Sequence, residues 1–522
     1  MTSLKIVLGT LVLLSIFLLG PQSVESRHAY RPIDDKVFSD SIMSGEQLAK
    51  IYCKMCHLFP EPNLLDKETW VSGVLPNMAL RLGIRANSVD PYEGLLEEEV
   101  SIIKPLGVYP EASLLSVEQW NKIVDYYVRE APSEPLGQKR TSAIANIGLP
   151  NFKVKSISIG DKPLPMTSML KFDDSNAELY VGDAQGVMYV MDSKMRLKNT
   201  WPVSNAPVDI DFPKGKEPRV LSIGVFRPSD QKLGSLTSLY KDKSSGHFEV
   251  DLQQLPRPVQ FQTGDLNMDG KEDIVICGFG NHSGKLFWLD NFEVDKAHVL
   301  KEMPGARKVV LKDLNNDNKL DIVVLMAQAW EQMSIFYNQG NNTFREKTVL
   351  RFPPVYGVSC FELTDFNKDG YLDILITNGD NWDFSPIRKN YHGVRIYLND
   401  GQDNFEEAYF YPLYGATKAV ARDFDADGDL DIAAISFYSD FDIPEQSFVY
   451  LSNEGNMEFK AFSTPEAANG KWLTMEVADL DVDGDLDIVL GSYFHNVGEM
   501  TKLIFKGVLS FPQIIVLNNE LK

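Results

Sequence analysis

The stretch IYCKMCHLFPEP, residues 51–62, holds two cysteines and a histidine in a C-x-x-C-H pattern. Cys53 and Cys56 supply two thiols for the two vinyl groups of a haem, and His57 places an imidazole beside them that can reach the iron. A four-ligand zinc site would need a second pair of cysteines or histidines nearby, and this segment has none. A redox-active dithiol is the remaining alternative, although such motifs sit in a βαβ context that is missing here. The pattern therefore predicts a covalently attached haem.

Two predicted helices bracket this motif. The first begins at Ser44, which is a plausible N-cap, and Pro60 and Pro62 stop it just after the histidine. The second begins at Ser116, carries apolar residues at helical spacing and ends before Pro132. An N-terminal helix running into C-x-x-C-H, a proline-rich turn and a closing helix resemble a class I cytochrome c, which is a small all-α domain.

The resemblance over residues 44–132 implies that His57 is the proximal iron ligand and that a methionine lies opposite it. Met78 is the one methionine between His57 and Pro132, so it is the possible distal ligand. Its position, early after His57, departs from the family pattern. An ordinary core methionine is the alternative interpretation of Met78.

A ten-residue acidic phrase occurs five times: DLNMDGKEDI (265–274), DLNNDNKLDI (313–322), DFNKDGYLDI (365–374), DFDADGDLDI (423–432) and DLDVDGDLDI (479–488). Oxygen side chains at positions 1, 3, 5 and 9 can converge on one hard cation, with a backbone carbonyl at position 7. Glycine at position 6 permits the sharp turn, and Asn318 replaces it in the second copy. Acidic turns without metal are the alternative, but five copies in one register favour calcium. The predicted ligands are Asp265, Asn267, Asp269, Asp273, Asp313, Asn315, Asp317, Asp321, Asp365, Asn367, Asp369, Asp373, Asp423, Asp425, Asp427, Asp431, Asp479, Asp481, Asp483 and Asp487.

The copies follow one another at intervals of 48, 52, 58 and 56 residues, which suits a four-stranded unit with its loops. They resemble the FG-GAP/VCBS repeats of calcium-binding β-propellers. Two degenerate copies precede them: the first places Lys171 where Asp265 stands, and the second keeps only Asp211. Five good and two degenerate copies predict an all-β seven-bladed propeller over residues 150–522. The strand at 151–159 is expected to close the ring by pairing with the last blade.

The metal loops of such blades lie on one face, so the turns between strands two and three and the links between blades lie on the other. Aromatic and polar residues gather in these segments, which suits a sugar or another polar organic ligand. Polar loop tips on a propeller that binds nothing there are the alternative. The candidate ligand face comprises Arg257, Asn281, His282, Arg307, Trp330, Trp382, Asp383, Lys418, Lys471, Trp472 and His495.

The chain of 522 residues has 51 basic and 73 acidic side chains and a formal net charge of −22. It has no cluster of basic residues that could bind along the phosphate backbone of a nucleic acid. The charge therefore disfavours nucleic-acid binding and adhesion to anionic membranes as functions. Lys5 precedes an apolar run over residues 6–19, which is typical of a secretory signal peptide. An uncleaved anchor is the alternative, although the run is short for a membrane span. Cys277 and Cys360 lie singly in strand-like runs and are expected to be buried thiols.

The predicted organisation is a signal peptide (1–26), an N-terminal linker (27–43), a haem domain (44–132), a second linker (133–149) and a propeller (150–522). It favours an exported bacterial electron-transfer protein, located in the periplasm, on the outer envelope surface or outside the cell. Its propeller would bind a redox partner or a polar, carbohydrate-like ligand. A propeller oxidoreductase or lyase acting on carbohydrate, and a calcium-dependent binding or adhesion module, are the alternatives. No Ser-His-Asp order, nucleotide loop or HExxH motif is present, so no catalytic residue is assigned.

Overall fold

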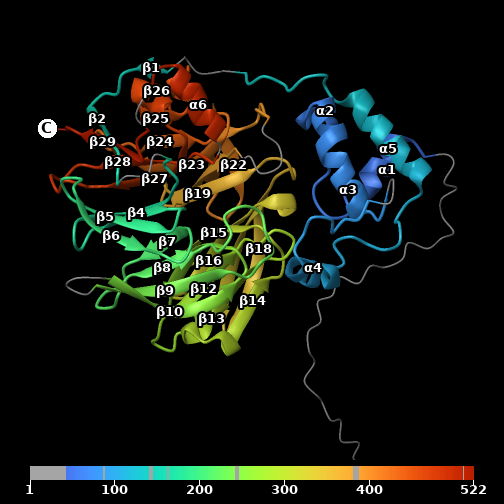
Figure 1. Ribbon diagram of the computed structural model, residues 1–522, viewed down its shortest axis with the longest axis horizontal. Helices are drawn as coiled ribbons and strands as arrows, with labels where there is room; N and C mark the ends of the chain where they lie inside the picture. Colours follow the sequence, from blue (N-terminus) through green and yellow to red (C-terminus); the bar gives the residue numbers. More distant parts are fainter. Residues whose placement is uncertain are drawn as a thin grey trace, which may run out of the picture. The chain divides into compact units, whose positions relative to one another are not determined.

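The first part of the described chain is helical. The computed structural model describes residues 43–85, 89–139, 145–160, 164–241, 246–379, 387–495, 497–508 and 511–521, so the predicted signal peptide lies outside the described residues. Residues Ser44–Lys522 group into one compact unit. The helices are α1 (Gly45–Tyr52), η1 (Pro62–Leu64), α2 (Lys67–Thr69), η2 (Trp70–Val74), α3 (Leu75–Arg81), α4 (Glu97–Ile103), η4 (Lys104–Leu106) and α5 (Val117–Glu130) (Figure 1).

The helices that bracket the C-x-x-C-H motif begin at the two predicted caps. Ser44 Oγ accepts the backbone N–H of Gln47, whose side chain accepts the N–H of Ser44 in return. Ser116 and Gln119 form the same reciprocal pair at the start of α5. Each capping box satisfies N–H groups that a helix start otherwise leaves unpaired, so the expected N-caps are confirmed.

Helices α1 and α5 pack tightly at Gly45. A Cβ atom on Gly45 would lie 1.9 Å from the carbonyl oxygen of Lys122 and 3.0 Å from the Cβ of Tyr126. The approach is possible only because this residue has no side chain, and it brings the start of the first helix against the middle of the last one. The apolar side chains buried in the helical part are Leu48, Ala49, Leu65, Trp70, Leu75, Ala79, Ile84, Ile103, Leu115, Trp120, Ile123, Tyr126 and Tyr127.

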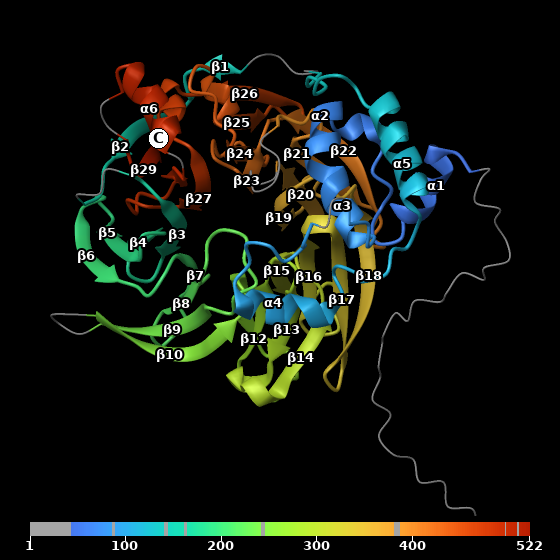
Figure 2. The same ribbon diagram turned by 45° about the vertical axis from the view of Figure 1, so that its right-hand side comes forward.

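The rest of the chain forms seven four-stranded antiparallel blades (Figures 1 and 2). Blade 1 contains β3 (Thr167–Asp173), β4 (Glu178–Asp183), β5 (Val187–Asp192) and β6 (Leu197–Pro202); blade 2 contains β7 (Pro207–Asp211), β8 (Arg219–Ser222), β9 (Gly234–Lys241) and β10 (Gly246–Leu255). Blade 3 contains β11 (Pro258–Gly264), β12 (Asp273–Gly278), β13 (Lys285–Leu289) and β14 (Ala297–Lys301); blade 4 contains β15 (Ala306–Lys312), β16 (Asp321–Met326), β17 (Gln332–Gly340) and β18 (Thr343–Arg351).

Blades 5 to 7 complete the ring. Blade 5 contains β19 (Val358–Thr364), β20 (Asp373–Asn378), β21 (Gly393–Asn399) and β22 (Phe405–Pro412); blade 6 contains β23 (Ala416–Arg422), β24 (Asp431–Ser436), β25 (Phe448–Asn453) and β26 (Phe459–Ser463). Blade 7 contains β27 (Trp472–Ala478), β28 (Asp487–Ser492) and β29 (Ile514–Asn519), and helix α6 (Val497–Phe505) lies between its second and third strands. The predicted seven-bladed propeller is confirmed.

The ring closes as the sequence predicted. Strand β2 (Phe152–Ile157) pairs antiparallel with β29, so the first strand of the propeller completes its last blade. A second contact was not predicted: β1 (Asn146–Ile147), inside the segment interpreted as a linker, pairs in parallel with β26. Pairing at both places protects strand edges that would otherwise be exposed.

The register of blade 1 corrects one prediction. Asp173 pairs with Glu178, as Gly264 pairs with Asp273 in blade 3, so Asp174 and not Lys171 corresponds to Asp265. The hairpin of blade 1 is much shorter than the acidic loops, and this length difference misaligned the sequences. Lys171 instead corresponds to Gln262, on the strand that lines the ring.

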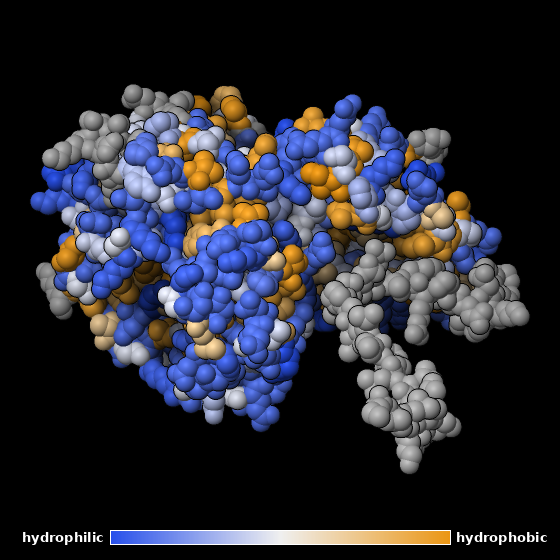
Figure 3. All heavy atoms as spheres, turned by 90° about the horizontal axis from the view of Figure 1, so that it is seen from below, coloured by the Kyte–Doolittle hydropathy of each residue, from blue (hydrophilic) through white to orange (hydrophobic). Residues whose placement is uncertain are grey.

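The core lies between the blades. The second strands of blades 3 to 7, which are β12, β16, β20, β24 and β28, are buried along their whole length. Each is covered by a neighbouring blade on both faces, which explains why these segments are continuous apolar runs rather than alternating ones. Among the described residues, no helix has the length and apolar character needed to span a membrane. The face shown in Figure 3 is largely hydrophilic with scattered apolar patches.

Candidate functional sites

The C-x-x-C-H motif lies between α1 and η1. Cys53 directly follows α1 and is partly exposed, and Cys56 is exposed. Nδ1 of His57 lies 2.8 Å from the carbonyl oxygen of Leu58. A nitrogen this close to a carbonyl oxygen carries the proton, so in the neutral ring Nε2 holds the lone pair. Burial lowers the pKa of His57, which favours that neutral form.

The segment after the motif is fixed by two hydrogen bonds from the helical core. Tyr127 Oη donates to the carbonyl oxygen of Pro60 at 2.9 Å, and Trp70 Nε1 donates to that of Pro62 at 2.8 Å.

Burial raises the pKa of the Cys53 thiol to about 11. Apolar side chains beside the motif are left exposed, by 44% for Met55 and 37% for Leu58. Met78 lies on α3 and is half-buried.

The five acidic loops share one turn geometry. In the first loop the side-chain oxygens of Asp265 accept the N–H groups of Asp269 and Gly270, and Asp269 Oδ1 accepts that of Lys271. Position 6 is left-handed in every loop, including Asn318 with φ 63°. Position 4 is also left-handed in every loop, which the sequence did not indicate. The residues there are Met268, Asn316, Lys368, Ala426 and Val482.

The last two loops gather the most carboxylates. One carboxylate oxygen from each of Asp423, Asp425 and Asp427 lies within 4.8 Å of the other two, and Asp479, Asp481 and Asp483 form an equivalent group. Asp423 Oδ1 is buried without a hydrogen-bond partner among the described residues. In the second loop Lys319 at position 7 pairs with Asp317 at 2.5 Å, so part of the charge there is already neutralised.

The aspartate at position 9 has a second role that the sequence did not reveal. All five of these residues are fully buried. In the fourth loop Asp431 Oδ2 accepts the N–H of Phe424 at 3.2 Å, and Oδ1 accepts that of Asn453 at the end of the third strand at 2.8 Å. The other four loops have the same two bonds, made by Asp273 to Leu266 and Asn291, Asp321 to Leu314 and Asn338, Asp373 to Phe366 and Asn399, and Asp487 to Leu480 and Asn519.

Two of these asparagines, Asn338 and Asn519, also link neighbouring blades. Asn338 Nδ2 of blade 4 donates to the carbonyl oxygen of Leu266 in the loop of blade 3 at 2.7 Å. Asn519 Nδ2 of blade 7 donates in the same way to Phe424 of blade 6 at 2.7 Å. An asparagine at or just after the third strand of each of blades 3 to 7 is visible in the sequence, and this repetition could have revealed its role.

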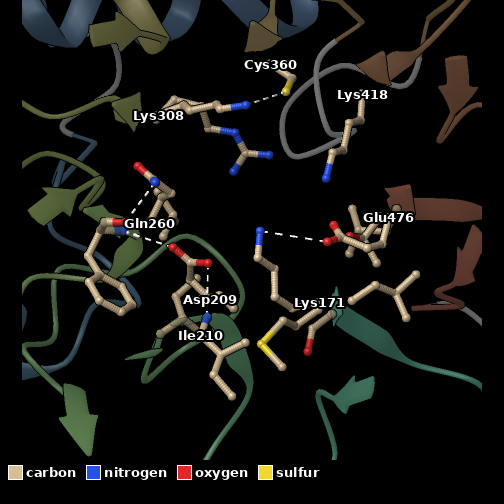
Figure 4. Close-up of a pocket in the computed structure, with 18 of the residues that line it drawn as sticks. Lys171, Asp209, Ile210, Gln260, Lys308, Cys360, Lys418 and Glu476 are labelled. Atoms are coloured by element: carbon tan, nitrogen blue, oxygen red, sulfur yellow. Dashed lines mark hydrogen bonds and ion pairs between the residues drawn. The ribbon is translucent and has the colours of Figure 1, made fainter. Parts of the chain in front are cut away.

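A cavity of about 1370 Å³ is enclosed by the first strands of all seven blades. The side chains facing it at mid-height include Lys171, Asp209, Gln260, Lys308, Cys360, Lys418 and Glu476 (Figure 4). Phe226, Phe279, Phe437 and Tyr493 line the end opposite the acidic loops. The arrangement combines a polar interior with an aromatic end, which suits a polar organic molecule.

The candidate ligand face is only partly brought together. Arg257, Arg307, Lys418 and His495 line the cavity. Trp330 lies on η7 (Gln328–Trp330), while Trp382 and Asp383 lie outside the described residues. Lys471 and Trp472 are a correction to the prediction. Lys471 Nζ is buried against Glu499 at 2.8 Å, and Trp472 is fully buried with Nε1 donating to Ala467, so neither can face a ligand.

The acidic segments match a known family. Residues 265–324, 313–376 and 423–490 match the FG-GAP-like repeat. These segments are FG-GAP-like repeats. A propeller built from them is a module for binding a protein or a ligand. No curated protein sequence matches the chain significantly.

Several solved structures match the chain at low sequence identity. The N-terminal domain of Nup159 is 12% identical, with 73% of this chain and 99% of that chain covered and a TM-score of 0.42. The Neurospora crassa Pan2 WD40 domain is 11% identical, with 72% and 98% covered and a TM-score of 0.42. A putative 6-phosphogluconolactonase from Bacteroides fragilis is 12% identical, with 58% and 86% covered and a TM-score of 0.39.

Asn281 and His282 belong to a hydrogen-bonded contact between the FG-GAP-like propeller and the helical part. His282 Nδ1 lies 2.9 Å from Asp230 Oδ2, and His282 Nε2 lies 2.9 Å from the Tyr109 hydroxyl. Asn281 Nδ2 lies 3.0 Å from His282 Nδ1. Glu99 Oε1 on α4 accepts the hydroxyl of Ser229 at 2.7 Å and the N–H of Asp230 at 3.0 Å. Asn281 and His282 therefore form hydrogen bonds to other residues of this chain.

Proposed function

We propose that this protein is an exported electron-transfer protein that carries a covalent haem at Cys53, Cys56 and His57. The FG-GAP-like propeller, stabilised by calcium, binds a redox partner or a polar ligand. The C-x-x-C-H motif between two capped helices supports the first part of the proposal. The repeats and the central cavity support the second.

The residues of the motif fit a haem, and one observation carries this conclusion. The contact between His57 Nδ1 and the carbonyl oxygen of Leu58 orients the ring so that Nε2 would be the atom that coordinates iron. Cys53 and Cys56 would form the two thioether bonds, and Met55 and Leu58 would lose their exposed apolar surface. Haem bound there supplies reversible one-electron transfer. Met78 would supply the second protein ligand to the iron.

Calcium is proposed for the acidic loops. The grouped carboxylates of the fourth and fifth loops, and the buried oxygen of Asp423 without a partner, fit a hard cation with oxygen ligands. The ligands would be the side chains at positions 1, 3 and 5. Position 9 would connect the site to the third strand, because its two oxygens already hold backbone N–H groups. The ion would neutralise charge and so stabilise the propeller rather than react.

Export is proposed from the N-terminal sequence. The basic residue, apolar run and small polar residues of 1–26 have the layout of a signal peptide. The mature protein would then work in the periplasm, on the envelope surface or outside the cell.

The haem proposal is tested by staining for haem after denaturing electrophoresis of full-length protein produced in a host that attaches haem to c-type cytochromes. The wild type and the Cys360→Ala control should give a stained band, because covalent attachment survives denaturation. A Cys53→Ala, Cys56→Ala double variant should give none. Absence of the band from folded wild-type protein would refute the proposal.

A further inference from the structure

The central cavity gathers more positive charge than an acidic protein would be expected to place there. Lys171, Lys308 and Lys418 come from three different blades and all line the cavity. In Figure 4 the amino groups of Lys171 and Lys418 point into the same open space, and that of Lys308 points toward Cys360 on the next blade. Three cations are thus gathered in the middle of a chain whose net charge is −22.

Two acidic side chains at mid-height of the cavity, Asp209 and Glu476, accept hydrogen bonds from its wall. Asp209 Oδ1 accepts the N–H of Ile210 at 3.0 Å, and Oδ2 accepts that of Phe261 on the next blade at 3.1 Å. Glu476 likewise accepts the N–H of Phe172 across to blade 1 at 3.4 Å. These carboxylates hold neighbouring blades together, as Gln260 does through the N–H of Val309 at 2.9 Å.

The lysines use little of their hydrogen-bonding capacity. Lys418 Nζ donates to the carbonyl oxygen of Met475 at 2.6 Å, and Lys308 Nζ lies 3.7 Å from the Cys360 thiol. Lys171 Nζ lies 3.8 Å from Glu476, which is at the limit of an ion pair. Within the described part of the chain, neither Lys308 nor Lys418 forms an ion pair with a carboxylate. An ammonium group has three donors, so most of this capacity faces the cavity.

Charge in a partly desolvated cavity is costly unless a counter-charge accompanies it. Desolvation lowers the pKa of Lys418, which agrees with a cation that is held away from water without full compensation. An anion seated between the lysines would remove this cost and would form charge-assisted hydrogen bonds to them.

We propose that the cavity binds a small polyhydroxylated carboxylate, such as a sugar acid, with its carboxylate between Lys171, Lys308 and Lys418. This inference names the ligand class of the proposed binding module and rests on that part of the proposed function. The cavity of about 1370 Å³ is large enough for such a molecule. Its hydroxyl groups would meet polar side chains such as Thr474, and its ring would face the end of the cavity lined by Phe226, Phe279, Phe437 and Tyr493.

The test is calorimetric titration of the full-length protein with D-glucuronate, its neutral methyl ester, D-glucose and inorganic phosphate. Glucuronate should bind at least tenfold more tightly than the ester or glucose, because only it carries the carboxylate. A Lys308→Met, Lys418→Met double variant should lose at least tenfold in glucuronate affinity. The Lys153→Met, Lys155→Met control removes the same number of charges from the exposed strand β2 and should bind as the wild type does.

The comparison of glucuronate with its ester uses the wild-type protein alone, so it decides the matter even if the double variant does not fold. Equal binding of acid and ester, binding of phosphate without glucuronate, or no binding of any probe would overturn the proposal. Heat of binding does not depend on haem, so the haem stain described above would be unaffected by such a failure.

Discussion

The Nδ1 atom of His57 and the carbonyl oxygen of Leu58 lie 2.8 Å apart, so the backbone next to the C-x-x-C-H motif sets the orientation of its imidazole. The same contact leaves Nε2 for a metal. The chemistry proposed for this part of the chain follows from that one contact together with the two cysteines, because covalent attachment needs thiols and iron needs an available ring nitrogen.

Met78 is predicted to complete a His/Met iron site. Replacing it with alanine should abolish the weak sulfur-to-iron absorption band of the oxidised protein, and it should lower the reduction potential because a thioether ligand raises it. Met55→Ala removes an exposed methionine beside the motif and is the matched control, which should keep the band. If the band is absent from the wild type, Met78 is a packing residue only.

Gly45 is predicted to be essential for the packing of α1 on α5. In Gly45→Ala the new methyl group would lie 1.9 Å from the carbonyl oxygen of Lys122, so the helices must separate. We expect a loss of about 1–3 kcal/mol in the free energy of unfolding of the helical part. Thermal unfolding followed by far-ultraviolet circular dichroism measures it. Gly73→Ala is the control, since a Cβ there meets nothing within 4 Å; equal stability of the two variants would contradict the packing.

Removal of calcium is predicted to destabilise the propeller. Each ion would bind the folded loop and scarcely the unfolded chain, which would contribute about 2.7 kcal/mol per site when calcium is at a hundred times the dissociation constant. Calorimetry with and without a chelator should show a large fall in the propeller transition. Asp427→Asn with Asp483→Asn should reduce that fall, whereas Asp295→Asn on an exposed 3-10 helix should not. An unchanged transition in protein shown to be free of metal would refute calcium stabilisation.

Val482 is predicted to be a strained residue of the last acidic loop. Its φ is 63°, a conformation that a β-branched side chain rarely adopts. Asparagine tolerates it, and Asn316 occupies the equivalent position in the second loop with φ 60°. Val482→Asn should therefore raise the free energy of unfolding by about 1 kcal/mol. Val294→Asn changes an equally exposed valine outside the left-handed region, and it should give no such gain. A Val482→Asn variant less stable than the wild type would contradict the strain.

Much of the fold could be predicted because its signals are local and repeated. The N-caps Ser44 and Ser116 predict the starts of two helices from motifs only four residues long. The five acidic loops at regular intervals define the blades. The closing strand at 152–157 could be inferred because the last unit lacks a fourth strand. These features depend on spacing along the chain, which a sequence shows directly.

The features that sequence analysis missed depend on partners that are distant in the chain or on exact register. Asp431 seemed a simple cation ligand, yet its oxygens hold Phe424 and Asn453, and the second of these lies on another strand. Lys171 was misaligned because the hairpin of blade 1 is short. The contact of Tyr109 with His282 joins residues 173 positions apart, and no local pattern indicates it.

The measurement that tests the central claim most directly is the haem content of the mature, full-length protein, determined from its alkaline pyridine spectrum and compared with protein concentration. The account predicts one haem per chain, with the spectrum of a haem attached through two thioether bonds, and no haem released by acidified organic solvent. A folded protein without haem, or with haem that the solvent extracts completely, would contradict it.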